Sequence, residues 1–177
     1  RNCESLTSVT IPESVKTIEP YAFVGCYALK SINLPSILTS IEDGVLSDCT
    51  ALESVEIPEG VTAIGRSAFR NCDGLTSVTI PENVVSIGNG AFWRCNGLTN
   101  LTIPDSVTSI GINAFIGCTA LRSVKISENL EVLSEAMFRG CTSLESVEIP
   151  ESVVSIGQEA LRECTALKSV TISDSVV

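Results

Sequence analysis

The stretch RNCDGLTSVTIPENVVSIGNGAF, from Arg70 to Phe92, contains the pattern of the whole chain. Nearly the same sequence precedes it, as DCTALESVEIPEGVTAIGRSAF from Asp48, and follows it, as RCNGLTNLTIPDSVTSIGINAF from Arg94. Self-similarity at a fixed period of 20–50 residues is the signature of stacked repeats. The period is given by the cysteines, each 23 residues after the one before: Cys3, Cys26, Cys49, Cys72, Cys95, Cys118, Cys141 and Cys164.

Each repeat contains one short segment with the alternation of a half-buried strand. A leucine follows every cysteine after three residues, as Leu75 follows Cys72, and an alternating Val-x-Ile follows the leucine, as at Val78 and Ile80. Apolar residues with a period of two predict a strand that buries one face. A proline follows in six of the eight copies, and it ends the strand because it has no N–H to donate to a continuing ladder.

The second half of each repeat predicts an arc and a compact turn. Apolar residues at the positions of Val84 and Ile87 indicate a tight second arc, and a glycine such as Gly88 frequently follows. An Ala-Phe pair then closes the repeat, and we expect it to lie on a short helical turn. We call the equivalent residues of successive repeats a column. The column of the phenylalanine contains Phe23, Leu46, Phe69, Phe92, Phe115, Phe138 and Leu161.

A single 23-residue unit cannot bury its own apolar side, whereas stacked units bury a continuous core. We therefore expect an α/β solenoid of about 7.7 repeats over residues 1–177, with a parallel β-sheet on one face and short helical or 3-10 turns opposite. No linker divides it into domains. Both ends fall within a repeat and resemble no capping unit, which favours a segment of a longer array over a subunit that pairs end to end.

The repeat L-x-x-V-x-I-P-x-x-V-x-x-I-G-x-x-A-F-x-x-C resembles the BspA-type leucine-rich repeat, and the resemblance covers the chain from end to end. Proteins of that family are mostly surface or secreted proteins of host-associated bacteria and of some protozoan parasites. The resemblance implies adhesion, through binding of host matrix proteins or other cells. It also implies an extracellular or cell-surface location, and it does not imply an enzyme.

The composition excludes several classes of function. The net charge is −10 and the isoelectric point about 4.4, and a surface of that charge repels phosphate backbones and anionic lipids. The longest apolar runs are far shorter than the ~20 residues that cross a bilayer, so no membrane insertion is expected. Histidine, the commonest general base and imidazole metal ligand, is absent. We expect neither catalysis nor a cofactor.

The cysteine column has three interpretations. Stacking brings neighbouring cysteines to about one strand spacing, which is inside the Cα separation that disulfides use. Side chains stacked in register point the same way, however, and form a line of sulfurs instead of a tetrahedral metal site. The favoured interpretation is a ladder of small buried side chains, each with an S–H that satisfies a turn carbonyl.

The candidate binding residues belong to two surfaces. Trp93, the only tryptophan, lies in an outward-facing column with Arg70, Ile116 and Arg139, a composition typical of a contact hot spot. The alternative is a tryptophan that lies flat against an arginine. The second surface is the outer side of the strands, where a nearly uniform serine column stands beside a variable one that includes Glu56, Thr79, Thr102, Lys125 and Glu148. This polar surface is either a binding platform or solubilising filler.

The sequence therefore predicts a non-enzymatic adhesion or protein-interaction module whose partner is a protein of the host matrix or of a cell surface. The alternative, from a different class, is a structural subunit that associates head to tail through its terminal repeats and forms a filament.

Overall fold

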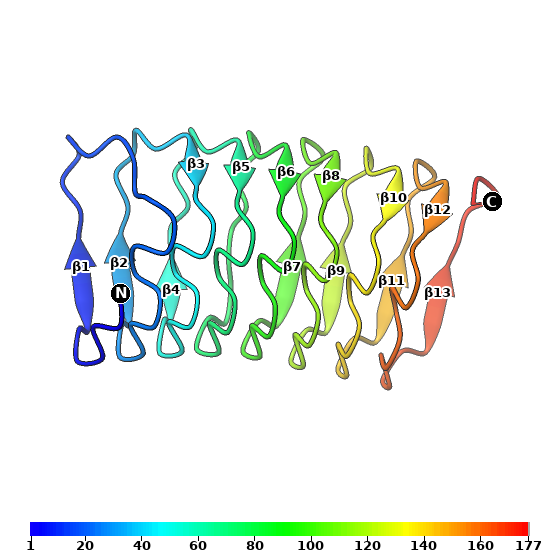
Figure 1. The fold of residues 1–177 in the computed structure, drawn as a ribbon. Coiled ribbons are helices and arrows are strands. Elements are labelled where there is room, and N and C mark those ends of the chain that lie inside the picture. Colours follow the sequence, from blue (N-terminus) through cyan, green and yellow to red (C-terminus); the bar gives the residue numbers. More distant parts are fainter. Residues whose placement is uncertain (177) are drawn as a thin grey trace.

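The computed structural model, which describes residues 1–176, is a continuous stack of 23-residue coils that runs from the N-terminus on the left of Figure 1 to the C-terminus on the right. Every coil except the fourth contributes one short strand to a main parallel sheet, whose outer side we call the strand face. The main strands pair in register, as Ser8 with Ser31 and Val9 with Ile32. These strands are β1 (Ser8–Thr10), β2 (Ser31–Asn33), β4 (Ser54–Val55), β7 (Asn100–Thr102), β9 (Ser123–Lys125), β11 (Ser146–Glu148) and β13 (Ser169–Thr171).

The main sheet is interrupted once. Residues 77–79 do not form a strand, so the sheet divides into β1-β2-β4 and β7-β9-β11-β13. In the strands on both sides, the central side chains Ile32 and Leu101 are buried while their neighbours are exposed. The predicted parallel sheet with a period of two is therefore confirmed, with a gap at the fourth copy.

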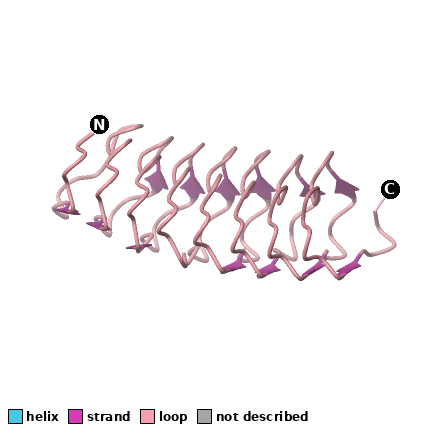
Figure 2. Ribbon diagram, turned by 90° about the horizontal axis from the view of Figure 1, so that it is seen from below, coloured by secondary structure: helices cyan, strands magenta, loops and turns pink. Residues whose placement is uncertain are grey.

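The predicted tight arc is a second parallel sheet of two-residue strands (Figure 2). It pairs Ile41 with Ile64, Ile64 with Ile87 and Ile87 with Ile110, so that one isoleucine of each strand enters the core. The strands are β3 (Ser40–Ile41), β5 (Ala63–Ile64), β6 (Ser86–Ile87) and β8 (Ser109–Ile110) in one group, with β10 (Val132–Leu133) and β12 (Ser155–Ile156) in another.

The prediction of helical or 3-10 turns opposite the sheet is wrong, because the described residues contain no helix (Figure 2). In the first Ala-Phe turn, amides alternate between two kinds of acceptor. The amides of Ala22 and Val24 donate locally, to carbonyls three residues back, whereas those of Tyr21, Phe23 and Gly25 donate to the next coil. A helix uses all its interior amides locally. Here half of them form a third ladder between coils, so the turns stay irregular.

This alternation requires left-handed backbone at two positions of each turn. The first position has φ +59° at Tyr21, +58° at Gly44 and +54° at Ser67, and the second has φ +71° at Gly25 and +62° at Asp48. Positive φ is unfavourable for residues with a Cβ other than Asn and Asp. We call the side of the molecule that carries these turns the turn face.

The core is a single cluster of side chains that runs the length of the stack. At its centre four phenylalanine rings stack at centroid distances of 5.1, 5.4 and 5.6 Å, with interplanar angles of 9–13°. The rings belong to Phe69, Phe92, Phe115 and Phe138, all completely buried. Because coils repeat in register, each ring meets the equivalent ring of the next coil.

The cysteines form the predicted structural ladder beside the phenylalanines. From Cys49 onward each thiol donates to the carbonyl of the residue 26 positions earlier, for example Cys95 Sγ to Phe69 O at 3.0 Å and Cys118 Sγ to Phe92 O at 3.2 Å. All eight are free thiols, and Cys3 alone is exposed. The described residues contain no group of side chains arranged to hold a metal ion.

Burial keeps these thiols protonated. Desolvation raises the pKa of Cys49 from its ordinary 9.0 to about 12 and raises the pKa of Cys72, Cys95 and Cys118 well above 9.0, with further contributions from neighbouring cysteines. A thiolate is the reactive form of cysteine. The fully buried thiols of Cys72, Cys95 and Cys118 are therefore inert toward oxidants and electrophiles while the coils stay stacked.

Replacing Phe92 by alanine should lower the free energy of unfolding by about 3–5 kcal/mol, because it opens a cavity between two stacked rings. Urea denaturation followed by circular dichroism measures this loss. Phe23→Ala is the matched control, since Phe23 is only partly buried and should cost less. Equal losses at the two positions would contradict a stack that is strongest at its centre.

Stability should fall as the pH rises above 9, because unfolded thiols then lose protons while the buried ones keep theirs. The contribution is fully present below pH 9, and at pH 10 it is smaller by about 1.4 kcal/mol for each fully buried cysteine. Urea unfolding at pH 7.5 and 10 tests this. In Cys95→Ala the difference between the two pH values should shrink by about that amount, and an unchanged difference would show that Cys95 ionises in the folded chain.

Candidate functional site

Trp93 lies on the turn face, where its ring stacks against the guanidinium of Arg70 in the preceding coil. The Arg70 Cζ atom is 4.8 Å from the ring centroid. The contact follows from the repeat, since the two residues are 23 positions apart in one column and coils lie about 4.8 Å from one another. It matches the alternative considered for Trp93, a tryptophan that lies flat against an arginine.

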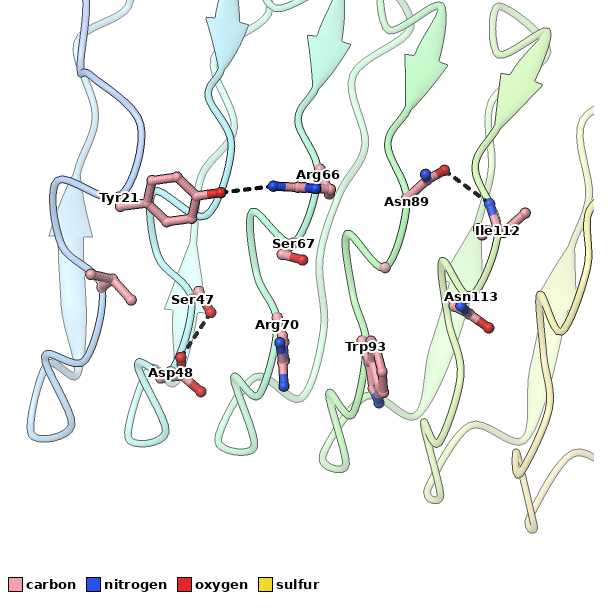
Figure 3. A pocket seen from close by; sticks show the side chains of 12 residues that line it. Tyr21, Ser47, Asp48, Arg66, Ser67, Arg70, Asn89, Trp93, Ile112 and Asn113 are labelled. Carbon is pink, nitrogen blue, oxygen red and sulfur yellow. Dashed lines mark hydrogen bonds between the residues drawn. The ribbon is translucent and has the colours of Figure 1, made fainter.

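The pair forms one wall of a shallow groove of about 430 Å³, which we call the turn-face groove (Figure 3). Small residues make its floor. Gly90, at φ +59°, lies directly below Trp93, where an added Cβ would be 3.4 Å from Cε3 of the ring. The groove is lined by Tyr21, Val24, Ser47, Asp48, Arg66, Ser67, Arg70, Asn89, Gly90, Trp93, Ile112 and Asn113.

A tyrosine and a second arginine form the opposite side of the groove. The Arg66 guanidinium donates from Nη2 to the Tyr21 hydroxyl at 3.1 Å, as Figure 3 shows. The bond spans two coils, because Tyr21 points along the stack over the glycine at position 44, where a Cβ would be 2.3 Å from the ring. This bond raises the pKa of Arg66 further above its ordinary value, with a smaller contribution from Asp43.

Most acceptors of the groove are already used within the protein. Both oxygens of Asp48 accept hydrogen bonds, one from Asn71 at 2.6 Å and the other from the Ser47 hydroxyl at 2.9 Å. The Asn89 side-chain oxygen accepts the backbone N–H of Ile112 at 3.1 Å. The two guanidinium groups are thus the main polar groups left to face solvent in the groove.

The other predicted members of the Trp93 column do not belong to the groove. Ile116 is in the next coil, outside the lining. Arg139 is two coils away and forms ion pairs with Glu159 at 2.7 Å and Glu163 at 3.7 Å. Stacking in register places column neighbours side by side, but the local acidic residues decide which arginines remain free.

Four residues of this site were not predicted from the sequence: Tyr21, Arg66, Asn89 and Asn113. Tyr21 and Arg66 occupy two different columns, neither of them that of Trp93, and all three columns line the groove beside the left-handed positions Tyr21 and Ser67. The available signal was the deviation of a residue from its column, as with Tyr21 among glycine, serine and asparagine.

The strand-face candidates are divided between two hollows. Lys125 and Glu148 line one of about 630 Å³ over β9, β11 and β13, together with Glu128 and Glu151. Thr79 and Thr102 line one of about 280 Å³ beside the interruption in the main sheet. Glu56 is exposed directly after β4. The strand face therefore offers separate shallow surfaces, only one of which carries both signs of charge, instead of one continuous platform.

The comparisons with known proteins agree with the repeat fold. The model of the BspA-type leucine-rich repeat region matches in six copies over residues 1–99 and 85–177. The chain belongs to the BspA-type leucine-rich repeat family. A search of curated proteins found no match.

Solved structures of leucine-rich repeat proteins have the same fold. A leucine-rich repeat protein from Bacteroides ovatus is 31% identical, with a TM-score of 0.89 over 96% of this chain and 46% of its own length. One from T. pallidum is 27% identical, with a TM-score of 0.84 over 91% and 78%. A leucine-rich cell surface protein from Faecalibacterium prausnitzii is 34% identical, with a TM-score of 0.63 over 98% and 55%. The chain thus spans about half the length of the B. ovatus and F. prausnitzii proteins.

The fold also occurs in the solved structure of the pneumococcal vaccine antigen PcpA, which is 20% identical to this chain. The T. pallidum and B. ovatus relatives are described as leucine-rich repeat proteins, and the F. prausnitzii relative as a leucine-rich cell surface protein. Within the described residues, no helix has the length and apolar character needed to cross a bilayer.

Replacing Arg70 by glutamine should expose Trp93 to solvent, because the guanidinium covers one face of its ring. Acrylamide quenching of tryptophan fluorescence measures this directly, since the chain has one tryptophan. The quenching constant should rise in Arg70→Gln and stay unchanged in Arg122→Gln, which removes a cation from the strand side. Unchanged quenching in both variants would contradict the stacked arrangement in solution.

Proposed function

We propose that this chain is a non-enzymatic protein-interaction module of a cell-surface or secreted protein, and that it mediates adhesion by binding a protein of the host matrix or of a cell surface. The observation that carries the proposal is the turn-face groove, where half-buried Trp93 and Tyr21 lie beside two exposed arginines that form no ion pair, on a scaffold whose core is uniform. Tryptophan, tyrosine and arginine are the residues most enriched in binding hot spots.

The groove differs from the equivalent surface of the later coils in one respect. At Arg139 and Arg162 the arginines of the same column are neutralised by Glu159 and Glu163, so that surface is a closed network of ion pairs. At Arg70 the arginine is packed on an aromatic ring instead. A partner can therefore contact Arg70 and Trp93 without first breaking an internal ion pair.

The surface location of the F. prausnitzii relative supports a role outside the cell for this chain. A buried and protonated cysteine ladder is compatible with such a location, because thiols there are inert without disulfides. The non-enzymatic part of the proposal is supported by the absence of histidine and by cysteines that are committed to the core.

Biolayer interferometry on immobilised fibronectin, laminin, fibrinogen and collagen tests the proposal. At least one of these should bind the monomer saturably, and Trp93→Ala should weaken that binding by 10-fold or more, which corresponds to about 1.4 kcal/mol. The double variant Lys125→Ala, Glu148→Ala serves as the matched strand-face control. If this double variant loses binding while Trp93→Ala binds as the unmodified chain does, the binding site lies on the strand face.

Light scattering on the same samples distinguishes the filament alternative. A monomer that binds a matrix protein supports an adhesion module. Particles that grow with concentration and bind none of the four proteins would contradict the proposal and favour the structural subunit.

A further inference from the structure

We propose that the turn-face groove recognises an acidic segment of the partner protein, with Arg66 and Arg70 as the two groups that bind its carboxylates. This inference rests on the proposed function, because it names the chemistry of the partner at the same site. It depends on three features of the groove: its charge, the orientation of its arginines and its length.

The groove is a cationic patch on an acidic protein. The chain has 21 acidic and 11 basic residues, yet the lining contains Arg66 and Arg70 against the single carboxylate of Asp48. Both Asp48 oxygens accept hydrogen bonds from neutral donors, so the carboxylate keeps its charge and the lining as a whole carries a net charge of about +1. The nearest other carboxylate, that of Asp43, accepts the backbone N–H of Arg66 at 2.6 Å. Within the described residues, neither guanidinium has a carboxylate at ion-pair distance.

Both guanidiniums are held in place by aromatic residues. Arg70 lies 4.8 Å from the centroid of Trp93, so its planar fork is fixed while its N–H groups stay free at the edges. Arg66 donates one N–H to the Tyr21 hydroxyl, and its other guanidinium N–H groups remain available to a ligand. An arginine that is already immobilised loses less conformational entropy when it binds a carboxylate with two parallel hydrogen bonds.

The groove has the length of a short peptide. Tyr21, Ser47, Ser67, Gly90 and Asn113 come from five successive coils, which at about 4.8 Å per coil gives roughly 19 Å. An extended chain of about six residues covers that distance at ~3.3 Å per residue. Ser67 and Asn113 line the same groove and place polar side chains beside the backbone of such a segment.

A local acidic segment fits better than a long polyanion. A sulfated polysaccharide or a nucleic acid extends beyond the groove and meets a protein of net charge −10, so its remaining charges are repelled. A short acidic stretch on a folded protein meets the groove alone. Charge complementarity of this kind also accelerates association, and the effect weakens with added salt.

Titration of the intact chain with the peptide Ac-(Glu-Gly)4-NH2 tests the proposal, with Ac-(Gln-Gly)4-NH2 as the uncharged control peptide. The single tryptophan reports binding without a label, and isothermal titration calorimetry supplies an independent Kd. We expect saturable binding of the glutamate peptide at 50 mM NaCl, at least 10-fold weaker binding of the glutamine peptide, and a several-fold loss of affinity at 300 mM NaCl.

Two charge-matched variants locate the site. Arg66→Gln leaves the Arg70–Trp93 stack intact and should weaken the glutamate peptide at least fivefold, as should Arg70→Gln. Arg122→Gln removes the same charge outside the groove and should leave the Kd within twofold. Equal effects of all three variants would mean that net charge alone attracts the peptide, which overturns the assignment.

A heparin hexasaccharide is the competing probe. If it binds through Arg66 and Arg70 while the glutamate peptide does not bind, the groove takes anionic glycans and the inference is wrong. If the glutamate peptide does not bind but a matrix protein still binds through Trp93, the inference of an acidic partner segment is wrong. The proposed protein-interaction function is then still supported. If no matrix protein binds but the peptide binds through both arginines, the proposed matrix partners are wrong. The assignment of Arg66 and Arg70 as carboxylate-binding residues is then supported.

Discussion

The structure depends on backbone hydrogen bonds that run between coils instead of within them. Amides of the main strands, of the second short sheet and of alternate turn residues all donate to a neighbouring coil, as Lys30 to Thr7, Gly65 to Ile41 and Phe23 to Val45. Because every coil has 23 residues, each ladder keeps its register along the chain. An inserted residue would shift all three ladders together, unless it left the coil as a loop. The constant period is thus a requirement of the hydrogen bonding.

This constraint explains why the core columns could be predicted from the sequence. Side chains of one column must meet one another, so Phe69 stacks on Phe92, and Cys95 lies near Cys72 with its thiol on a fixed carbonyl. Uniform columns of Val, Ile, Leu, Phe and Cys could therefore be assigned to the interior. The cysteine ladder followed by the same reasoning, since parallel side chains at one strand spacing are poorly placed for disulfides.

The conformation of the turn could not be predicted in the same way. An Ala-Phe pair in a compact turn is compatible with a helix, and the apolar pattern does not reveal where the amides donate. The decisive feature is a left-handed residue at Tyr21, Ser67 and Asn113, which interrupts the local bonds of a helix and directs alternate amides to the next coil. These residues have side chains that carry no strong preference for that conformation, with asparagine the exception. The tertiary ladder therefore overrides the local preference.

The candidate site was predictable only in part, for a related reason. Column neighbours meet by necessity, so the contact between Arg70 and Trp93 was foreseeable from their spacing of 23 residues. Arg66 and Tyr21 line the same groove beside the left-handed turn and bond to each other there. Arg139 is held instead in an ion pair with Glu159 of the following coil. A uniform interior thus fixes where outward side chains stand, while their individual identities decide whether a cation is neutralised or left available. In this fold, a change of one exposed residue can alter binding without disturbing the ladders, and this separation lets a repetitive scaffold carry a specific surface.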